Sequence, residues 1–196
     1  MAAKQADKSS RTKKQITIAA RKLFHEKGYE ETTIADIASE AGYAVGTFYR
    51  HFKTKTDIAE ELYQTISNAT ARSNQQAMYD RCASIYEALD YILDLFSEPS
   101  DENQEITDLY YVLVYSKVNC ARPASISIFS ESLLHYLEIQ LPQAPSTVLK
   151  TYADIMIALL NTFWLSSTNA GLMPLDKAIV RDTLYAIAET CIQKNS

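Results

Sequence analysis

The fourteen residues GYAVGTFYRHFKTK, from Gly42 to Lys55, concentrate aromatic rings and positive charge directly after a glycine. Rings and basic groups together suit contact with DNA, because N–H and O–H groups donate to phosphates and apolar groups meet base edges. The other interpretation is that a ring here belongs to the hydrophobic core, as a single aromatic side chain usually does. The position of each ring on its helix decides whether it contacts DNA or belongs to the core.

Charge is unevenly distributed along the 196 residues, whose formal net charge is -5. Residues 1–55 hold 11 Lys and Arg against 6 Asp and Glu, whereas residues 56–196 hold 8 against 18. A basic segment joined to an acidic body indicates that the basic segment meets a polyanion. A lysine-rich disordered tail would account only for the first dozen residues.

The composition favours an all-α protein with a sizeable core. Hydrophobic residues make up 47% of the chain, while glycine and proline number only 4 and 5. The three cysteines are far apart and form no CxxC pair, so neither a disulfide nor a zinc site is expected. The N-terminus shows no secretory signal, and the apolar run 155–165 is too short for a membrane span. We therefore expect a cytoplasmic protein.

Start and stop signals predict the first helices. Residues 1–11 read as a loose basic arm, followed by a helix with Thr12 as N-cap and Gln15 closing a capping box. This helix should end at Gly28, since glycine commonly follows the last turn.

A second helix should start at Thr33, with Asp36 closing another capping box. It should end at Gly42, because glycine enters the left-handed conformation without steric cost. A short third helix covers about 45–52, and Thr54 with Asp57 forms the capping box of a longer fourth helix. We place a domain boundary here, with a DNA-binding domain at 1–55 and a second domain at 56–196. Apolar periods in the second domain predict helices at about 55–79, 83–97, 104–120, 124–140, 146–170 and 176–193.

Two short helices joined at Ala41-Gly42-Tyr43 have the helix-turn-helix layout, whose second helix enters the DNA major groove. With Phe48 and Phe52 facing inward, the neighbouring side chains are left towards DNA. Such spacing also arises by chance in all-helical proteins. The candidate DNA contacts are Thr33, Val45, Gly46, Thr47, Tyr49, Arg50, His51 and Lys55.

Residue types suggest how these contacts divide. Val45 and the Thr47 methyl group suit a thymine methyl, and the Thr47 hydroxyl suits a base or a phosphate. Tyr49 and His51 can donate to phosphates. Lys55 lies in the first turn of the next helix, where free N–H groups already attract an anion.

From Ile16 to Leu62 the chain resembles the DNA-binding domain of the tetracycline-repressor (TetR-type) family of bacterial regulators. The resemblance rests on AARKLFHEKGYEETTIADIASEAGYAVGTFYRHFKTKTDIAEEL. It implies an all-helical homodimer whose first three helices bind operator DNA and whose C-terminal helical domain dimerises and binds an inducer. By analogy, the DNA-contacting places fall to Thr33, Val45, Gly46, Thr47, Tyr49, His51 and Lys55.

Three positions depart from the family pattern. Ala44 stands where a serine usually caps the recognition helix, and alanine is a cap poorer by about 1 kcal/mol. Ala35 replaces a common polar contact residue, and Tyr43 replaces a smaller aliphatic one. We therefore expect phosphate contacts and DNA shape to matter beside a few base contacts.

A ligand pocket is predicted in the acidic body, which holds ten of the thirteen tyrosines and the single tryptophan. Tyr111, Tyr115, Asn161 and Trp164 form the candidate set, since rings with a few polar atoms are typical of small-molecule sites. Such a pocket suits an apolar or aromatic ligand. The alternative is an ordinary core whose tyrosine hydroxyls lie at its edge.

The last two helices predict a dimer. The run 155–165 is apolar nearly all round, which indicates a helix covered on both sides. The final helix carries an apolar stripe formed by Val180, Leu184, Ile187, Ala188 and Cys191. Two such helices from each subunit can form a four-helix bundle. Alternatively, they cover only their own core.

Enzyme motifs are absent: no GxSxG, P-loop, GxGxxG or HExxH occurs, and the three histidines are scattered. We therefore expect no catalytic site, metal or cofactor. The favoured function is a homodimeric repressor on a palindromic DNA operator, released by a small-molecule effector. The alternatives are a DNA-binding regulator without such an inducer, and a helical ligand-binding protein that does not act on DNA.

Overall fold

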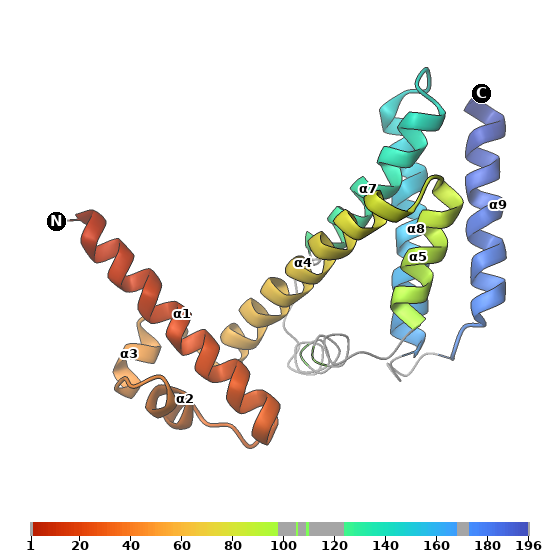
Figure 1. The fold of residues 1–196 in the computed structure, drawn as a ribbon. Helices are drawn as coiled ribbons and strands as arrows, with labels where there is room; N and C mark the ends of the chain where they lie inside the picture. Colours follow the sequence, from red (N-terminus) through yellow and green to blue (C-terminus); the bar gives the residue numbers. More distant parts are fainter. Residues whose placement is uncertain (1, 98–104, 106–108, 110–123, 168–172, 196) are drawn as a thin grey trace. The chain divides into compact units, whose positions relative to one another are not determined.

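The computed structural model describes residues 2–97, 105, 109, 124–167 and 173–195, and every regular element among them is a helix (Figure 1). The prediction of an all-α protein is confirmed. The described helices form two compact units, divided between Thr65 and Ile66 inside one long helix.

The first helix, α1, spans Ala2–Lys27, so the prediction of a loose arm over residues 1–11 is wrong. Alanine, lysine and glutamine dominate this stretch, and each is a good helix former. Thr12 is not an N-cap either. Its hydroxyl donates to the Lys8 carbonyl at 3.0 Å, within the helix, so nothing stops the helix there.

A helix stop and a helix N-cap that the sequence predicted are both present. α1 stops at Gly28, whose φ is +83°, and the Gly28 N–H donates to the Phe24 carbonyl at 3.0 Å. α2 spans Ile34–Glu40 with Thr33 as its N-cap and Asp36 completing the capping box. These two predictions are confirmed.

α4 spans Lys55–Arg81 and contributes to both units. Its capping box is confirmed, since Thr54 N–H donates to Asp57 Oδ2 and Asp57 N–H donates to Thr54 Oγ1, both at 3.1 Å. Its first turns belong to the first unit: Glu61 forms an ion pair with Lys13 of α1, and Leu62 is buried. The division therefore falls after these turns rather than at the change in charge.

Among its described residues, the second unit holds four further helices: α5 (Ile85–Ser97), α7 (Ala124–Gln140), α8 (Ser146–Ser167) and α9 (Lys177–Asn195). These match the helices predicted at 83–97, 124–140, 146–170 and 176–193 to within three residues at either end. The helix predicted at 104–120 lies outside the described residues, apart from positions 105 and 109.

α8 is the central helix of this unit and packs against α5, α7 and α9 (Figure 1). Leu149, Met156 and Leu160 lie on its fully buried side. Within the described ranges, it is also the one helix long and apolar enough to cross a membrane. Its packing explains that apolar character, because a helix contacting three neighbours needs apolar residues on most of its surface.

Candidate DNA interface

The first unit presents a short helix after a tight turn. α2 ends at Gly42, whose φ is +75°, and Tyr43 N–H donates to the Ala38 carbonyl at 2.8 Å. This bond across the last turn of α2 redirects the chain into α3, Val45–Tyr49. α3 is shorter than the predicted 45–52, because the chain leaves the helix at Arg50.

Two phenylalanine rings hold α3 in place, as predicted. Phe48 is 0% exposed and Phe52 is 4% exposed, and their ring centroids are 5.6 Å apart. Burying each ring contributes about 1.5–3 kcal/mol, so this pair fixes which face of α3 points outward. Ile16 and Ile37, both 0% exposed, are further members of the core of this unit.

The outward face of α3 carries the candidate base contacts. Val45 is 40% exposed and Tyr49 is 54% exposed, unusually high fractions for large apolar side chains. Thr47 is half-buried. A Cβ added to Gly46 would meet no atom within 4 Å, so packing within the protein does not require glycine there. The bare backbone at Gly46 is open to a partner.

The hydroxyl of Thr33 lies at the exposed start of α2. It accepts a hydrogen bond from Asp36 N–H at 3.1 Å, while Asp36 Oδ2 accepts from Thr33 N–H at the same distance. The pKa of Asp36 is lowered, chiefly by the bond from the Thr33 backbone. Since the Thr33 oxygen is the acceptor, its hydrogen remains free to donate to a phosphate.

Thr47 and Arg50 interact with each other. Arg50 Nη2 donates to Thr47 Oγ1 at 3.2 Å along the exposed side of the turn after α3. His51 is half-buried next to them. In this geometry the Thr47 hydroxyl keeps its own hydrogen for donation.

Lys55 has partners inside the protein that the sequence did not indicate. Its ammonium donates to the Tyr29 carbonyl at 2.6 Å and to the Glu30 carbonyl at 3.2 Å, and lies 4.1 Å from the centre of the Tyr29 ring. An ammonium has three N–H donors, so one remains for a phosphate. Lys55 therefore ties the α1–α2 connection to the start of α4, whatever else it binds.

The three departures from the family pattern have distinct surroundings. Ala44 has extended N-cap geometry, with φ −73° and ψ 150°, but no side-chain cap. Ala35 is exposed. The hydroxyl of Tyr43 donates to Gln15 Oε1, so the residue predicted to close the first capping box instead joins α1 to the turn.

The predicted ligand pocket can be followed only in part. Tyr111 and Tyr115 lie outside the described residues. Asn161 and Trp164 are both half-buried on α8. Two buried oxygens that the sequence did not single out, Ser67 Oγ and Asn68 Oδ1 of α4, have no hydrogen-bond partner.

No group of three or more His, Cys, Asp or Glu side chains in the described part of the chain could hold a metal ion.

Comparison with known proteins accords with this geometry. Residues 16–62 match the family "Bacterial regulatory proteins, tetR family". An uncharacterized HTH-type transcriptional regulator of Bacillus subtilis, YerO, is 26% identical over 162 residues, which is 74% of this chain and 56% of YerO. The chain thus spans about half the length of the curated relatives it matches.

Solved structures share the fold over nearly the whole chain. A TetR-family regulator from Pectobacterium atrosepticum gives a TM-score of 0.64 at 18% identity, covering 96% of both chains. Thermus thermophilus FadR, a TetR family repressor in complex with lauroyl-CoA, gives 0.56 at 17%, covering 92% of this chain and 93% of FadR.

Fold and site together define an all-helical protein with an N-terminal helix-turn-helix unit and a separate helical unit. The matched residues 16–62 lie within the helix-turn-helix unit. Over these residues the chain matches the tetR family of bacterial regulatory proteins, and over nearly its whole length it shares the fold of solved TetR-family regulators.

Proposed function

We propose that the protein is a cytoplasmic transcriptional repressor that binds a palindromic DNA operator as a homodimer and is released by a small apolar or aromatic ligand. The observation that carries the proposal is the exposed face of α3. Buried Phe48 and Phe52 hold this helix so that Val45, Gly46 and Tyr49 face outward. The family match over the same residues supports the assignment.

On the proposed interface, α3 enters the major groove. Val45 and the Thr47 methyl group meet thymine methyl groups, while Gly46 allows close approach of the backbone. Phosphates are held from both sides of α3. The proposed phosphate donors are Thr33, Tyr49, Arg50, His51 and the third N–H of Lys55.

The stripe predicted on the final helix is covered within its own unit, since Val180, Leu184, Ala188 and Cys191 are at most 3% exposed. The homodimer is supported instead by the outer faces of α8 and α9. They carry no charged residue over two stripes, which we call the dimer stripes: Val148, Thr151, Ile155, Ala158 and Thr162 on α8, and Ile179, Thr183, Ala186 and Thr190 on α9. Each of the four threonine hydroxyls donates to the carbonyl four residues before it, at 2.7–2.9 Å.

Because these hydroxyls are already satisfied, the stripes can be covered without leaving a buried donor unpaired. Alanine and threonine are small enough to let helices approach closely. Pairing the stripes of two copies gives a four-helix bundle, which sets two α3 helices for half-sites about 34–36 Å apart.

A ligand in the second unit is supported by unmet hydrogen-bonding capacity. Leaving a buried oxygen without a donor costs about 1–3 kcal/mol, so a ligand that donates to Ser67 Oγ or Asn68 Oδ1 would recover part of it. Asn161 and Trp164 on α8 offer a polar group and a ring. FadR, which shares the fold, binds an acyl chain as its CoA ester. Release requires the ligand to favour a dimer geometry that no longer matches the half-sites.

The direct test is binding of the purified protein to a duplex from its own upstream region at two salt concentrations. We expect sequence-selective, nanomolar binding that weakens as salt rises. Thr47→Val, which keeps the shape but removes the hydroxyl, should lower affinity at particular bases. Tyr49→Phe, which removes only a hydroxyl, should weaken all sequences about fivefold. A protein that binds every duplex alike would contradict the proposal.

The ligand is tested separately. A metabolite panel is screened for compounds that raise the melting temperature of the pure protein, because a ligand stabilises the state it binds. Operator affinity is then measured with and without each hit. If operator affinity is the same with and without every hit, the proposed release by a ligand is wrong, while the proposed DNA binding is unaffected.

A further inference from the structure

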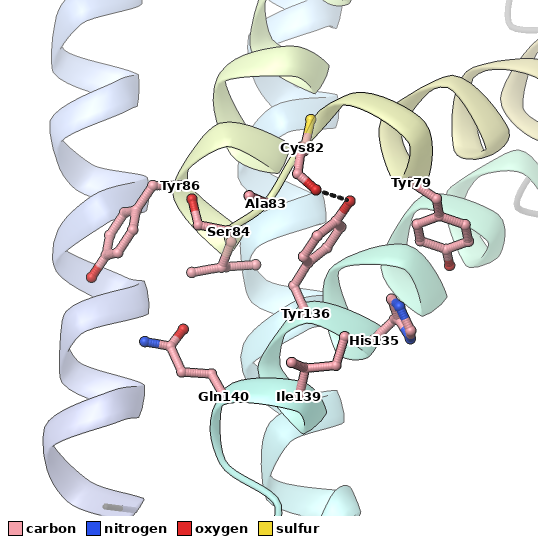
Figure 2. A pocket seen from close by; sticks show the side chains of 10 residues that line it. Tyr79, Cys82, Ala83, Ser84, Tyr86, His135, Tyr136, Ile139 and Gln140 are labelled. Carbon is pink, nitrogen blue, oxygen red and sulfur yellow. Dashed lines mark hydrogen bonds between the residues drawn. The ribbon is translucent and has the colours of Figure 1, made fainter.

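A cleft of about 460 Å³ lies where α4 ends and α5 begins, against the last turns of α7 (Figure 2). This volume is within the range of small-molecule sites. None of its lining residues comes from the helix-turn-helix unit, and neither Asn161 nor Trp164 lines it. It is lined by Tyr79, Cys82, Ala83, Ser84, Ile85, Tyr86, His135, Tyr136, Ile139 and Gln140.

Four of the lining residues are rings, and one is firmly fixed. The Tyr136 hydroxyl donates towards the Met78 and Cys82 carbonyls, at 2.9 and 3.2 Å. The Tyr79 ring lies 4.9 Å from the His135 ring and 6.1 Å from the Tyr136 ring. The fourth ring, Tyr86, lies across the cleft in Figure 2. Such a set offers several π faces to one ligand.

The helix ends around the cleft favour positive charge. α4 ends at Arg81 and α7 ends at Gln140, so the C-terminal ends of two helices border the cleft, although the Met78 and Cys82 carbonyls already accept from Tyr136. A helix C-terminus carries a partial negative charge that attracts cations. The N-terminus of α5 is already capped, since Ala83 N–H donates to Glu87 Oε2 at 2.8 Å and Glu87 N–H to Ser84 Oγ at 3.3 Å. These N–H groups are therefore not free to bind an anion.

Nearby carboxylates act in the same direction. None of the ten lining residues is Lys or Arg. Burial raises the pKa of Tyr86, and the Glu189 carboxylate raises it further. Burial likewise raises the pKa of Tyr136 to about 12, with smaller contributions that include Glu87. Arg81 opposes these carboxylates, since it acts to lower the pKa of the Cys82 thiol that burial and Glu87 raise.

We propose that this cleft binds a small organic cation with a flat or apolar body, such as a quaternary or protonated aromatic amine. The aromatic rings supply cation–π contacts. The C-terminal ends of α4 and α7, together with the Glu87 and Glu189 carboxylates, supply negative charge. The site is separate from Asn161 and Trp164, the predicted pocket residues that the structure describes. Asn161 stands fifteen residues after Ser146 on α8, about 22 Å along the helix from the end that adjoins α7.

His135 and Trp164 can serve as NMR reporters that distinguish the cleft from the predicted pocket. His135 lies at the cleft and is one of three histidines, the others being His25 and His51 of the first unit. Trp164, the single tryptophan, reports on the predicted pocket. Phenyltrimethylammonium is titrated into the full chain at fixed pH, and the His ring and Trp indole proton signals are followed by NMR. We expect saturable shifts of His135 and unchanged Trp164, His25 and His51.

Ligand and protein variants test the chemistry. The anion benzenesulfonate and the neutral tert-butylbenzene should shift His135 at least fivefold less readily than the cation. Tyr79→Leu should weaken cation binding about fivefold by removing one ring. Glu189→Gln should weaken it about twofold, whereas Asp182→Asn, the same charge change two turns earlier on α9, should have no effect.

Four results would overturn the proposal: no His135 shift at millimolar cation, a shift confined to Trp164, equal binding of the three probes, or equal effects of Glu189→Gln and Asp182→Asn. None of these results depends on DNA binding. Failure here therefore leaves the proposed repressor function standing, and failure of operator binding leaves this site standing.

Discussion

Replacing Ala44 by serine should stabilise the start of α3 by about 1 kcal/mol. Ala44 already has the backbone of an N-cap, with φ −73° and ψ 150°, close to the −98° and 159° of Thr33, which does cap α2. The Thr47 N–H already donates to the Ala44 carbonyl at 2.8 Å, so a serine oxygen at position 44 would share that N–H or accept from the Gly46 N–H without moving the chain. Ala44 is exposed, so the new hydroxyl meets no steric obstacle from burial.

The assay is hydrogen exchange of the α3 amides by NMR. A gain of about 1 kcal/mol slows exchange through local opening of α3 about fivefold. The amides of α5, in the other unit, should exchange as before. Ala44→Thr and Ala44→Val form a matched pair, because threonine and valine have the same shape and only threonine can accept the bond.

Protection that rises with threonine but not with valine assigns the effect to the hydrogen bond. Equal protection in both variants, or faster exchange in the serine variant, would refute the reasoning. In that case the first turn of α3 is held by contacts other than its cap.

Further expectations concern both units. Lys55→Met should lower the unfolding free energy of the first unit by roughly 1–2 kcal/mol in urea unfolding, because two carbonyls and the Tyr29 ring lose the ammonium; no change would mean that this lysine does not hold the connection. For Asp57, burial acts to raise its pKa, but hydrogen bonds from Thr54 and Lys53 outweigh it and lower the pKa. The stability that the Asp57 carboxylate contributes is fully present above the unfolded pKa of about 4 and is lost as pH falls through the lower folded pKa. In an acid titration, Asp57→Asn should therefore lose less unfolding free energy over this pH range than the unchanged protein. Ile155→Glu on the dimer stripes should give a monomer in sedimentation. Ile18→Glu, at a position that is 59% exposed against 49% for Ile155, should not.

Local signals predicted the turns and caps of the first unit well. The glycines at 28 and 42 and the Thr33 and Thr54 capping boxes depend on residues within five positions, so a single sequence suffices. The buried pair Phe48 and Phe52 followed from helical spacing.

The errors arose where no local signal decided the outcome. Thr12 and Gln15 fit a capping box, but strong helix formers before them allow α1 to begin at Ala2. The capping hydroxyl then bonds within its own helix, and Gln15 turns to Tyr43.

Contacts between distant residues were not predictable from one sequence. Lys55 meets the carbonyls of Tyr29 and Glu30 across 26 and 25 positions. The aromatic cleft joins Tyr79 to Tyr136 on two separate helices. Neither arrangement leaves a spacing pattern, because each depends on how the helices pack. The predicted pocket had the same difficulty, and only its Asn161 and Trp164 lie in the part of the chain that the structure describes.

The most direct test of the central claim is selection of bound duplexes from a randomised DNA library by the full-length protein. A homodimer reading DNA through two α3 helices predicts enrichment of a near-palindrome whose half-site centres lie about one helical turn apart, or a multiple of it. Loss of the enriched sequence with Thr47→Val would connect it to α3. Recovery of duplexes with no shared sequence would contradict the account, since α3 would then not read DNA.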